Sequence, residues 1–200
     1  EAGAMTAGVD LLQSDNVDME PDRLDIAHLA FTVLDADGVM VPWSNDPIHF
    51  AWSGPVLHLG FENGNHADVA PHRTRQRSVF HGMGLGIFQA TDGECPIEIT
   101  AAGILGDDLF PESTVAAIAV NRIALRGDLA PAEYDIHYTT DGSRPTPASP
   151  RYESAIHLTE DTTINALILR DGQPFMEFAR EFTRGEKPRF EDPRLLLPNG

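Results

Sequence analysis

Residues 138–172 read YTTDGSRPTPASPRYESAIHLTEDTTINALILRDG, and apolar and polar side chains alternate over much of this stretch. Such alternation is the pattern of a β-strand that buries one face. Asp-Gly pairs at 141–142 and 171–172 tolerate the positive φ that tight hairpin turns need. Three prolines between residues 145 and 150 stiffen a segment that cannot join a ladder of backbone hydrogen bonds. The stretch therefore predicts short strands, tight turns and one proline-rich crossing.

The same alternation continues along the rest of the chain. The runs that predict strands are 24–35, 47–54, 84–90, 95–102, 115–125, 133–139, 154–159, 162–169 and 174–182. Two more Asp-Gly pairs, at 37–38 and 92–93, stand between strand-like runs. No long stretch has a 3.6-residue apolar period, and 17 Gly and 15 Pro argue against helices. Short strands with frequent turns predict an all-β fold of antiparallel β-sandwiches.

The chain is long enough for one large or two small domains. An acidic segment with a proline, GDDLFPES, follows a strand-like run and suggests a boundary at 106–113. The C-terminal stretch GEKPRFEDPRLLLPNG holds three prolines and has no clear period. We expect an N-terminal lead-in or artificial remnant at 1–21, a first domain at 22–106, a linker at 107–116, a second domain at 117–184 and an irregular tail at 185–200.

The charge and the cysteine content narrow the function classes. Lys and Arg number 14 against 31 Asp and Glu, which gives a net charge of −17. An acidic surface repels phosphate backbones and anionic lipids, so we expect neither nucleic acid nor membrane as a partner. The single cysteine, Cys95, cannot form an internal disulfide, so the redox compartment is not readable. The polar opening EAGAMTAGVD lacks the basic start of a signal peptide, and we expect a cut end there.

A series of landmarks between residues 22 and 105 resembles the immunoglobulin-like domain that follows the catalytic barrel in bacterial family 2 glycoside hydrolases, the β-galactosidase group. The matching residues are Asp35, Asp37, Gly38, Val41, Pro42, Phe50, Gly54, Gly60, Asn63, Gly64, Arg77, Phe80 and Gly82. The sequence departs from the family at Asn65-His66, where Asp-Pro is usual, and in the His- and Arg-rich segment before Arg77.

The second half resembles the immunoglobulin-like domain at the C-terminus of chitobiases and β-hexosaminidases. The matching residues are Tyr138, Thr139, Asp141, Gly142, Pro145, Thr146, Tyr152, Thr163, Ile164 and Ala166. The two resemblances together imply two tandem immunoglobulin-like antiparallel β-sandwiches. They further imply a non-catalytic accessory region of a bacterial β-galactosidase-like glycosidase, which supports the catalytic domain or an oligomer.

This resemblance implies partners in the parent protein. A catalytic (β/α)₈ barrel with its two glutamates is expected upstream of this chain. The barrel is not expected within the chain, because it needs about 200–250 residues and alternating helices that this chain lacks. A homo-oligomer contact and a carbohydrate are the other partners considered, and no cofactor is expected. The localisation is left open, although relatives that degrade polysaccharides are often periplasmic or secreted.

Two pairs of acids are the candidates for chemistry in this chain, because glycoside hydrolysis needs two carboxylates about 5–10 Å apart facing a sugar pocket. Asp35 and Asp37 begin a predicted hairpin turn, and Asp107 and Asp108 stand in the predicted linker. Neither location presents a pair to a barrel, so we expect no catalytic residue and no enzyme activity in these 200 residues.

Histidines suggest a metal site, but their spacing does not favour one. His66, His72 and His81 could converge near the loop after Asn63. No H-x-x-x-H or Cys-His spacing supports a metal, and no Asp-Gly turn matches a full calcium loop. We therefore expect a polar surface loop there and no metal.

Trp43 is the candidate for carbohydrate binding. Sugar C–H faces stack on exposed aromatic rings, and Trp43 follows Pro42 near a turn. Trp52 continues the face of Ile48 and Phe50, which predicts a place in the core. Two alternatives to structural support therefore stay open: a carbohydrate-binding module, and a pure interaction or spacer domain. For Arg77, in an Arg cluster with Arg73 and Arg75, we expect an internal partner.

Overall fold

A computed structural model describes residues 8–186, apart from the side chains at 11–13. The described chain is all-β, which confirms the predicted fold class. Within residues 8–186 there is no helix, and so none that could cross a membrane. Most of the expected tail, from residue 187 on, and the first seven residues of the expected lead-in lie outside the described residues.

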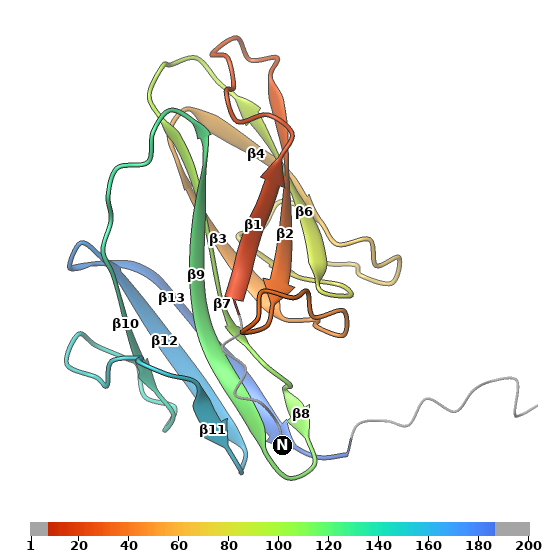
Figure 1. The fold of residues 1–200 in the computed structure, drawn as a ribbon, viewed down its shortest axis with the longest axis vertical. Coiled ribbons are helices and arrows are strands. Elements are labelled where there is room, and N and C mark those ends of the chain that lie inside the picture. The colour runs from red at the N-terminus through yellow and green to blue at the C-terminus, as the bar shows by residue number, and fades with distance from the viewer. Residues whose placement is uncertain (1–7, 187–200) are drawn as a thin grey trace, which may run out of the picture.

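The strands form three sheets (Figure 1). The first outer sheet has the order β1 (Gly8–Ser14), β2 (Ile26–Leu34), β6 (Met83–Ala90) and β4 (Val56–Glu62). The central sheet has the order β11 (Ile156–Leu158), β9 (Thr114–Arg126), β7 (Ile97–Leu105), β3 (Pro47–Ser53) and β5 (Gln76–Ser78). The second outer sheet has the order β10 (Tyr134–Thr139), β12 (Thr162–Arg170), β13 (Gln173–Arg184) and β8 (Leu109–Phe110). All these neighbours are antiparallel except β13 and β8.

The central sheet is shared by both sandwiches. Every residue of β7 is buried, and its side chains alternate between the two faces. Ile99 and Ala101 pack in the first core, whereas Ala102 and Ile104 pack in the second. Strand β9 pairs with β7 along almost its whole length and contributes to both cores in the same way. The molecule is therefore a three-layered body in which one sheet closes two sandwiches.

The first core is rich in phenylalanine, and β6 makes room for it with glycines. A Cβ on Gly84 would lie 2.1 Å from the ring of Phe31, and one on Gly86 would lie 2.7 Å from the ring of Phe61. These two rings meet edge to face with centroids 6.0 Å apart. The inner face of β6 therefore carries small residues because aromatic rings from β2 and β4 occupy the space above it.

Nine strands lie close to the predicted runs, whereas β1, β4, β5 and β8 had no predicted run. Two of these four also change the expected boundaries. Strand β1 lies within the expected lead-in and pairs with β2. Residues 107–116, the expected linker, hold β8, a turn and the first residues of β9. The two-residue β8 is too short for alternation to be visible, and its partner β13 is distant in the sequence.

Candidate functional site

The exposed candidate for ligand binding, Trp43, lies in a short loop between β2 and β3. Its side chain is 66% exposed. The loop, residues 40–46, begins at Met40, which bridges Leu34 at the end of β2. We call these residues the Trp43 loop.

Two buried polar residues hold the Trp43 loop in place. The Ser44 hydroxyl donates to the carboxylate of Asp46, and both residues are buried. The Ser44 backbone oxygen accepts from the amide of Gly82 at 2.9 Å, and the Asp46 oxygen accepts from the amide of Val79 at 3.0 Å. The loop is therefore anchored to the segment that leads into β6, although Trp43 itself points to solvent.

The second sandwich also holds this loop. Arg180 of β13 forms a buried ion pair with Asp46. The same guanidinium donates to the carbonyl oxygens of Ile104 at 2.6 Å and of Gly106 at 2.9 Å. The amide of Gly106 in turn donates to the Asp46 carboxylate at 3.2 Å. Asp46 is thus the point at which the loop, the central sheet and the second outer sheet meet.

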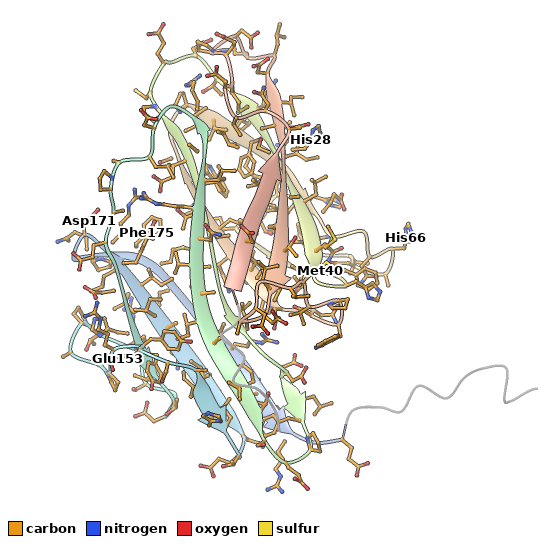
Figure 2. The ribbon with its side chains drawn as sticks, in the orientation of Figure 1. His28, Met40, His66, Glu153, Asp171 and Phe175 are labelled. Carbon is orange, nitrogen blue, oxygen red and sulfur yellow. The ribbon has the colours of Figure 1, made fainter. Side chains whose placement is uncertain are left out.

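The surroundings of Trp43 are apolar. Val39 is 59% exposed and Met83 is 47% exposed. His81 Nδ1 lies 3.2 Å from the carbonyl oxygen of Pro42, and its ring contacts Phe80 with centroids 4.2 Å apart. Figure 2 shows Met40 and His66 on the side of the first sandwich that faces away from Glu153 and Asp171 of the second. An aromatic ring and aliphatic side chains therefore share this surface.

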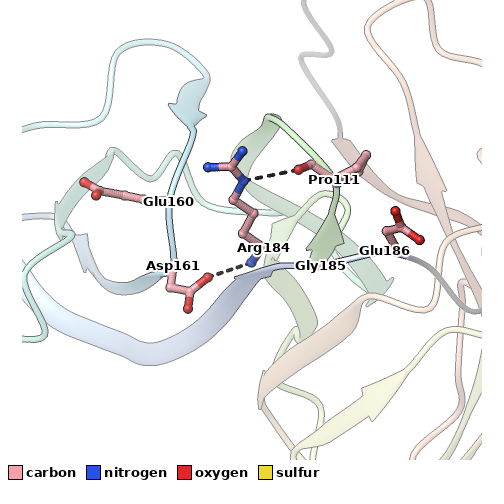
Figure 3. A pocket seen from close by; sticks show the side chains of 6 residues that line it. All are labelled: Pro111, Glu160, Asp161, Arg184, Gly185 and Glu186. Carbon is pink, nitrogen blue, oxygen red and sulfur yellow. Dashed lines mark hydrogen bonds between the residues drawn. The ribbon is translucent and has the colours of Figure 1, made fainter.

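A hollow lined by acids lies where β8 pairs with the end of β13. It is shallow and open, has a volume of about 670 Å³, and is lined by Pro111, Glu160, Asp161, Arg184, Gly185 and Glu186. The Asp161 carboxylate accepts from the backbone amide of Arg184 at 2.7 Å. Glu160 and Glu186 point to opposite sides of the hollow (Figure 3). The acids at this hollow therefore do not converge on a common point.

The acid pairs considered from the sequence serve turns and contacts. The Asp35 carboxylate accepts from the amides of Asp37 at 3.0 Å and Val39 at 2.9 Å, which closes the hairpin turn. The backbone oxygen of Asp108 accepts from Thr183, and its carboxylate lies 3.8 Å from Arg180. Neither Asp35 nor Asp108 lines the open hollow near Arg184 or the small cavity beside Trp52.

The three histidines considered for a metal site have separate partners. His72 Nδ1 lies 2.8 Å from the Glu62 carboxylate, and His81 lies against Pro42. His66 is exposed. Across the part of the chain that the structure describes, no three His, Cys, Asp or Glu side chains are grouped so that they could hold a metal ion.

The arginine cluster before β6 is used internally. Arg77 is 3% exposed, forms an ion pair with Asp68 at 3.2 Å and donates to the carbonyl of Ala70 at 3.0 Å, as the sequence led us to expect. The Arg75 guanidinium lies over the Trp52 ring, 4.3 Å from its centroid. Trp52 packs against the first core, which confirms its predicted place.

Charged and aromatic contacts join the central sheet to the second outer sheet. Arg170 of β12 donates to both oxygens of Glu98 of β7, at 2.7 and 3.0 Å, and this hydrogen bonding raises the pKa of Arg170. The His49 ring of β3 stacks on Phe178 of β13 with centroids 4.5 Å apart. Burial lowers the pKa of His49 to about 4, so this ring is neutral at pH 7.

Sequence reasoning missed the residues that join the sandwiches. Arg180 occupies the same face of β13 as Phe178 and Phe182, so a charged residue at an inward position was a usable signal. Glu98 stands between Ile97 and Ile99 in the same way. Asp46 lies outside any alternation and gave no signal.

Comparison with known proteins gives the family of each half. Residues 11–107 match the glycoside hydrolase family 2 C-terminal domain 5, and residues 113–175 match the chitobiase/beta-hexosaminidase C-terminal domain. A putative beta-glucuronidase from Formosa agariphila is 27% identical over 155 residues, which are 76% of this chain and 15% of that protein.

A solved structure agrees with the fold. A beta-glycosidase from Bacteroides vulgatus is 17% identical, with a TM-score of 0.51 over 60% of this chain and 14% of that one. The chain therefore spans about 15% of the curated relative that it matches. The two resemblances seen in the sequence are confirmed: residues 11–107 match the C-terminal domain 5 of glycoside hydrolase family 2, and residues 113–175 match the C-terminal domain of chitobiases and beta-hexosaminidases.

Proposed function

We propose that this chain is a non-catalytic accessory region of a bacterial family 2 glycoside hydrolase and that it supports the catalytic part of a longer polypeptide. The observation that carries the proposal is the use of the central sheet. Strand β7 is buried along its whole length and β9 contributes to both cores, so these two strands offer little free surface on which to build a sugar cleft. The domain matches and the small share of the relative that the chain spans support the same reading.

The arrangement of acids also supports a role without chemistry. A retaining or inverting glycosidase needs a pair of carboxylates about 5–10 Å apart that face one sugar ring. At the open hollow, Asp161 is engaged by the backbone of Arg184, and Glu160 and Glu186 diverge. Glu98 is engaged by Arg170 between the sandwiches.

We propose only the class of substrate for the longer enzyme, a glycoside, and not the identity of the sugar. The sequence landmarks resemble the β-galactosidase group, whereas the curated relative is named a putative beta-glucuronidase. We therefore propose a glycosidase and name both sugars as substrates to be tested.

Hydrolysis assays test the proposal. The purified 200-residue chain is incubated with nitrophenyl β-galactoside and nitrophenyl β-glucuronide, and we expect no release above buffer. The longer natural polypeptide that carries these residues should hydrolyse one of them. Turnover by the 200-residue chain that disappears in Asp161→Asn would contradict an accessory role.

A second candidate function, carbohydrate binding, is favoured by Trp43. Its indole is 66% exposed on a loop that buried hydrogen bonds hold still, and a rigid exposed ring suits stacking on a sugar. Calorimetry against galactans and chitin fragments should then give millimolar or tighter binding that is lost in Trp43→Ala. Leu57→Ala, on another exposed apolar side chain, is the matched control. If calorimetry detects no heat of binding, or if Trp43→Ala binds as tightly as the unmodified chain, this function is excluded.

A further inference from the structure

Strand β6 is apolar on its inward face and, apart from Gln89, on its outward face. Its inward residues are Gly84, Gly86, Phe88 and Ala90. Phe88 and Ala90 belong to the first core, and the two glycines lie against aromatic rings of that core. Its outward residues begin with Met83, Leu85 and Ile87, which are partly or largely exposed. The solvated face of an antiparallel sheet normally carries polar residues, so large aliphatic side chains here are unexpected.

The neighbouring strands extend this apolar surface. The register places Ala30 of β2 opposite Leu85, and it places Ile26 and Leu57 on either side of Gln89. Met40 continues the surface at its other end, because it bridges Leu34. We define the apolar strip as Ile26, Met40, Leu57, Met83, Leu85 and Ile87. Four of these side chains, at 26, 40, 57 and 83, are 39–47% exposed. The register also places the polar residues His28, Glu62 and Gln89 beside the strip. A large apolar surface that is rimmed by polar residues marks an interaction site.

We propose that the apolar strip is the docking surface for the domain that precedes this chain in the longer polypeptide, an inference that rests on the proposed function. Most of the curated relative lies outside the match, so such a polypeptide has ample length to supply a partner. The described part of the chain enters the sheet at Gly8, which pairs with Leu34 beside the Met40 end of the strip. A domain tethered there meets the strip at a high effective concentration.

Two other occupants fit the strip less well. Its side chains are aliphatic and offer no ring on which a sugar can stack, which disfavours a polysaccharide. A second copy of the chain would bring together two bodies of net charge −17, and this repulsion opposes self-association. A flat aliphatic sheet face is complementary to an apolar protein surface, as at interfaces within obligate assemblies.

Methionine oxidation tests the docking surface, because peroxide converts exposed thioethers to sulfoxides. The 200-residue chain and the longer natural polypeptide are treated with hydrogen peroxide, and each methionine is followed by peptide mass spectrometry. We expect Met40 and Met83 to be oxidised about tenfold more slowly in the longer polypeptide. Met19, which is 1% exposed, should be slow in both, and Met176 of the second sandwich should be oxidised at the same rate in both.

A variant and a mass measurement sharpen the test. In the longer polypeptide, the pair Leu85→Ser and Ile87→Ser should restore fast oxidation of Met40 and Met83. Equal oxidation rates of Met40 and Met83 in the two unmodified proteins would overturn the proposal. Light scattering that shows the 200-residue chain to be a dimer, together with protection of both methionines in that dimer, would also overturn it. A longer polypeptide that protects them but hydrolyses no nitrophenyl glycoside would refute the proposed function and leave the docking surface standing.

Discussion

Arg180, on β13 of the second sandwich, forms an ion pair with Asp46 at the end of the Trp43 loop of the first sandwich. The two side chains are only 9% and 6% exposed. Backbone carbonyls of Ile104 and Gly106 accept two further guanidinium hydrogens, so fixed polar groups help to stabilise the buried charge. A loop of one sandwich is thereby positioned by a side chain of the other.

Arg180→Met should therefore destabilise the whole protein. Removing one partner of a buried ion pair leaves an uncompensated charge and costs about 3–5 kcal/mol. The free energy of unfolding is measured by urea denaturation. The matched control is Arg144→Met on the same sandwich, where Arg144 pairs with Glu177 but is 80% exposed. We expect little change there, and equal effects of the two substitutions would contradict the role given to Arg180.

The glycines of β6 give a second test. Gly84→Ala would place a Cβ 2.1 Å from the Phe31 ring, and the ring cannot move without disturbing the first core. Overpacking of this kind costs about 1–3 kcal/mol or more. Gly8→Ala on the edge strand β1 has nothing within 4 Å of the added carbon and serves as control. The melting temperature should fall in the first variant only, and an unchanged Gly84→Ala protein would show that the inner face of β6 is less tightly packed.

His49 makes stability depend on pH between about 6.5 and 4. Burial lowers the pKa of His49 to about 4 from the ordinary value of 6.5. Below pH 6.5 the unfolded chain binds a proton that the folded chain does not, so stability falls as the pH drops through this window and is fully present above it. The loss is at most about 3 kcal/mol at pH 4.

The His49→Phe variant isolates this contribution, because phenylalanine keeps a ring against Phe178 and has no proton to bind. The free energy of unfolding is measured at pH 7.0 and pH 4.5 for both proteins. The decrease between the two pH values should be smaller in the variant by about 1–3 kcal/mol. The same decrease in both proteins would mean that His49 titrates normally in the folded state.

Alternation predicted most of the strands, because sheets with one buried face repeat every two residues. It could not predict that β7 serves two cores. The run IEITAAGIL is apolar at almost every position, and such a run indicates burial on both sides without naming the elements that cover it. Pairing of β9 with β7 depends on contacts that no local pattern encodes. The same holds for Asp46, whose partner Arg180 lies 134 positions further along the chain.

The candidate site was predictable in part. The position of Trp43 after a proline and near a turn indicated exposure, and the side chain is 66% exposed. The apolar strip was not predictable, because the run at 84–90 predicts a strand without showing which of its faces is buried. The glycine face is the buried one, since the rings of Phe31 and Phe61 occupy the space above Gly84 and Gly86.

The central sheet is shared by both sandwiches. The accessory role, the anchoring of the Trp43 loop and the docking surface all depend on this feature. Differential scanning calorimetry of the 200-residue chain tests it, because strands β7 and β9 cannot lose one core without exposing the other. We expect one transition whose calorimetric and van't Hoff enthalpies are equal. Two separate transitions, one for each sandwich, would show that the halves are independent domains and would contradict a single three-layered body.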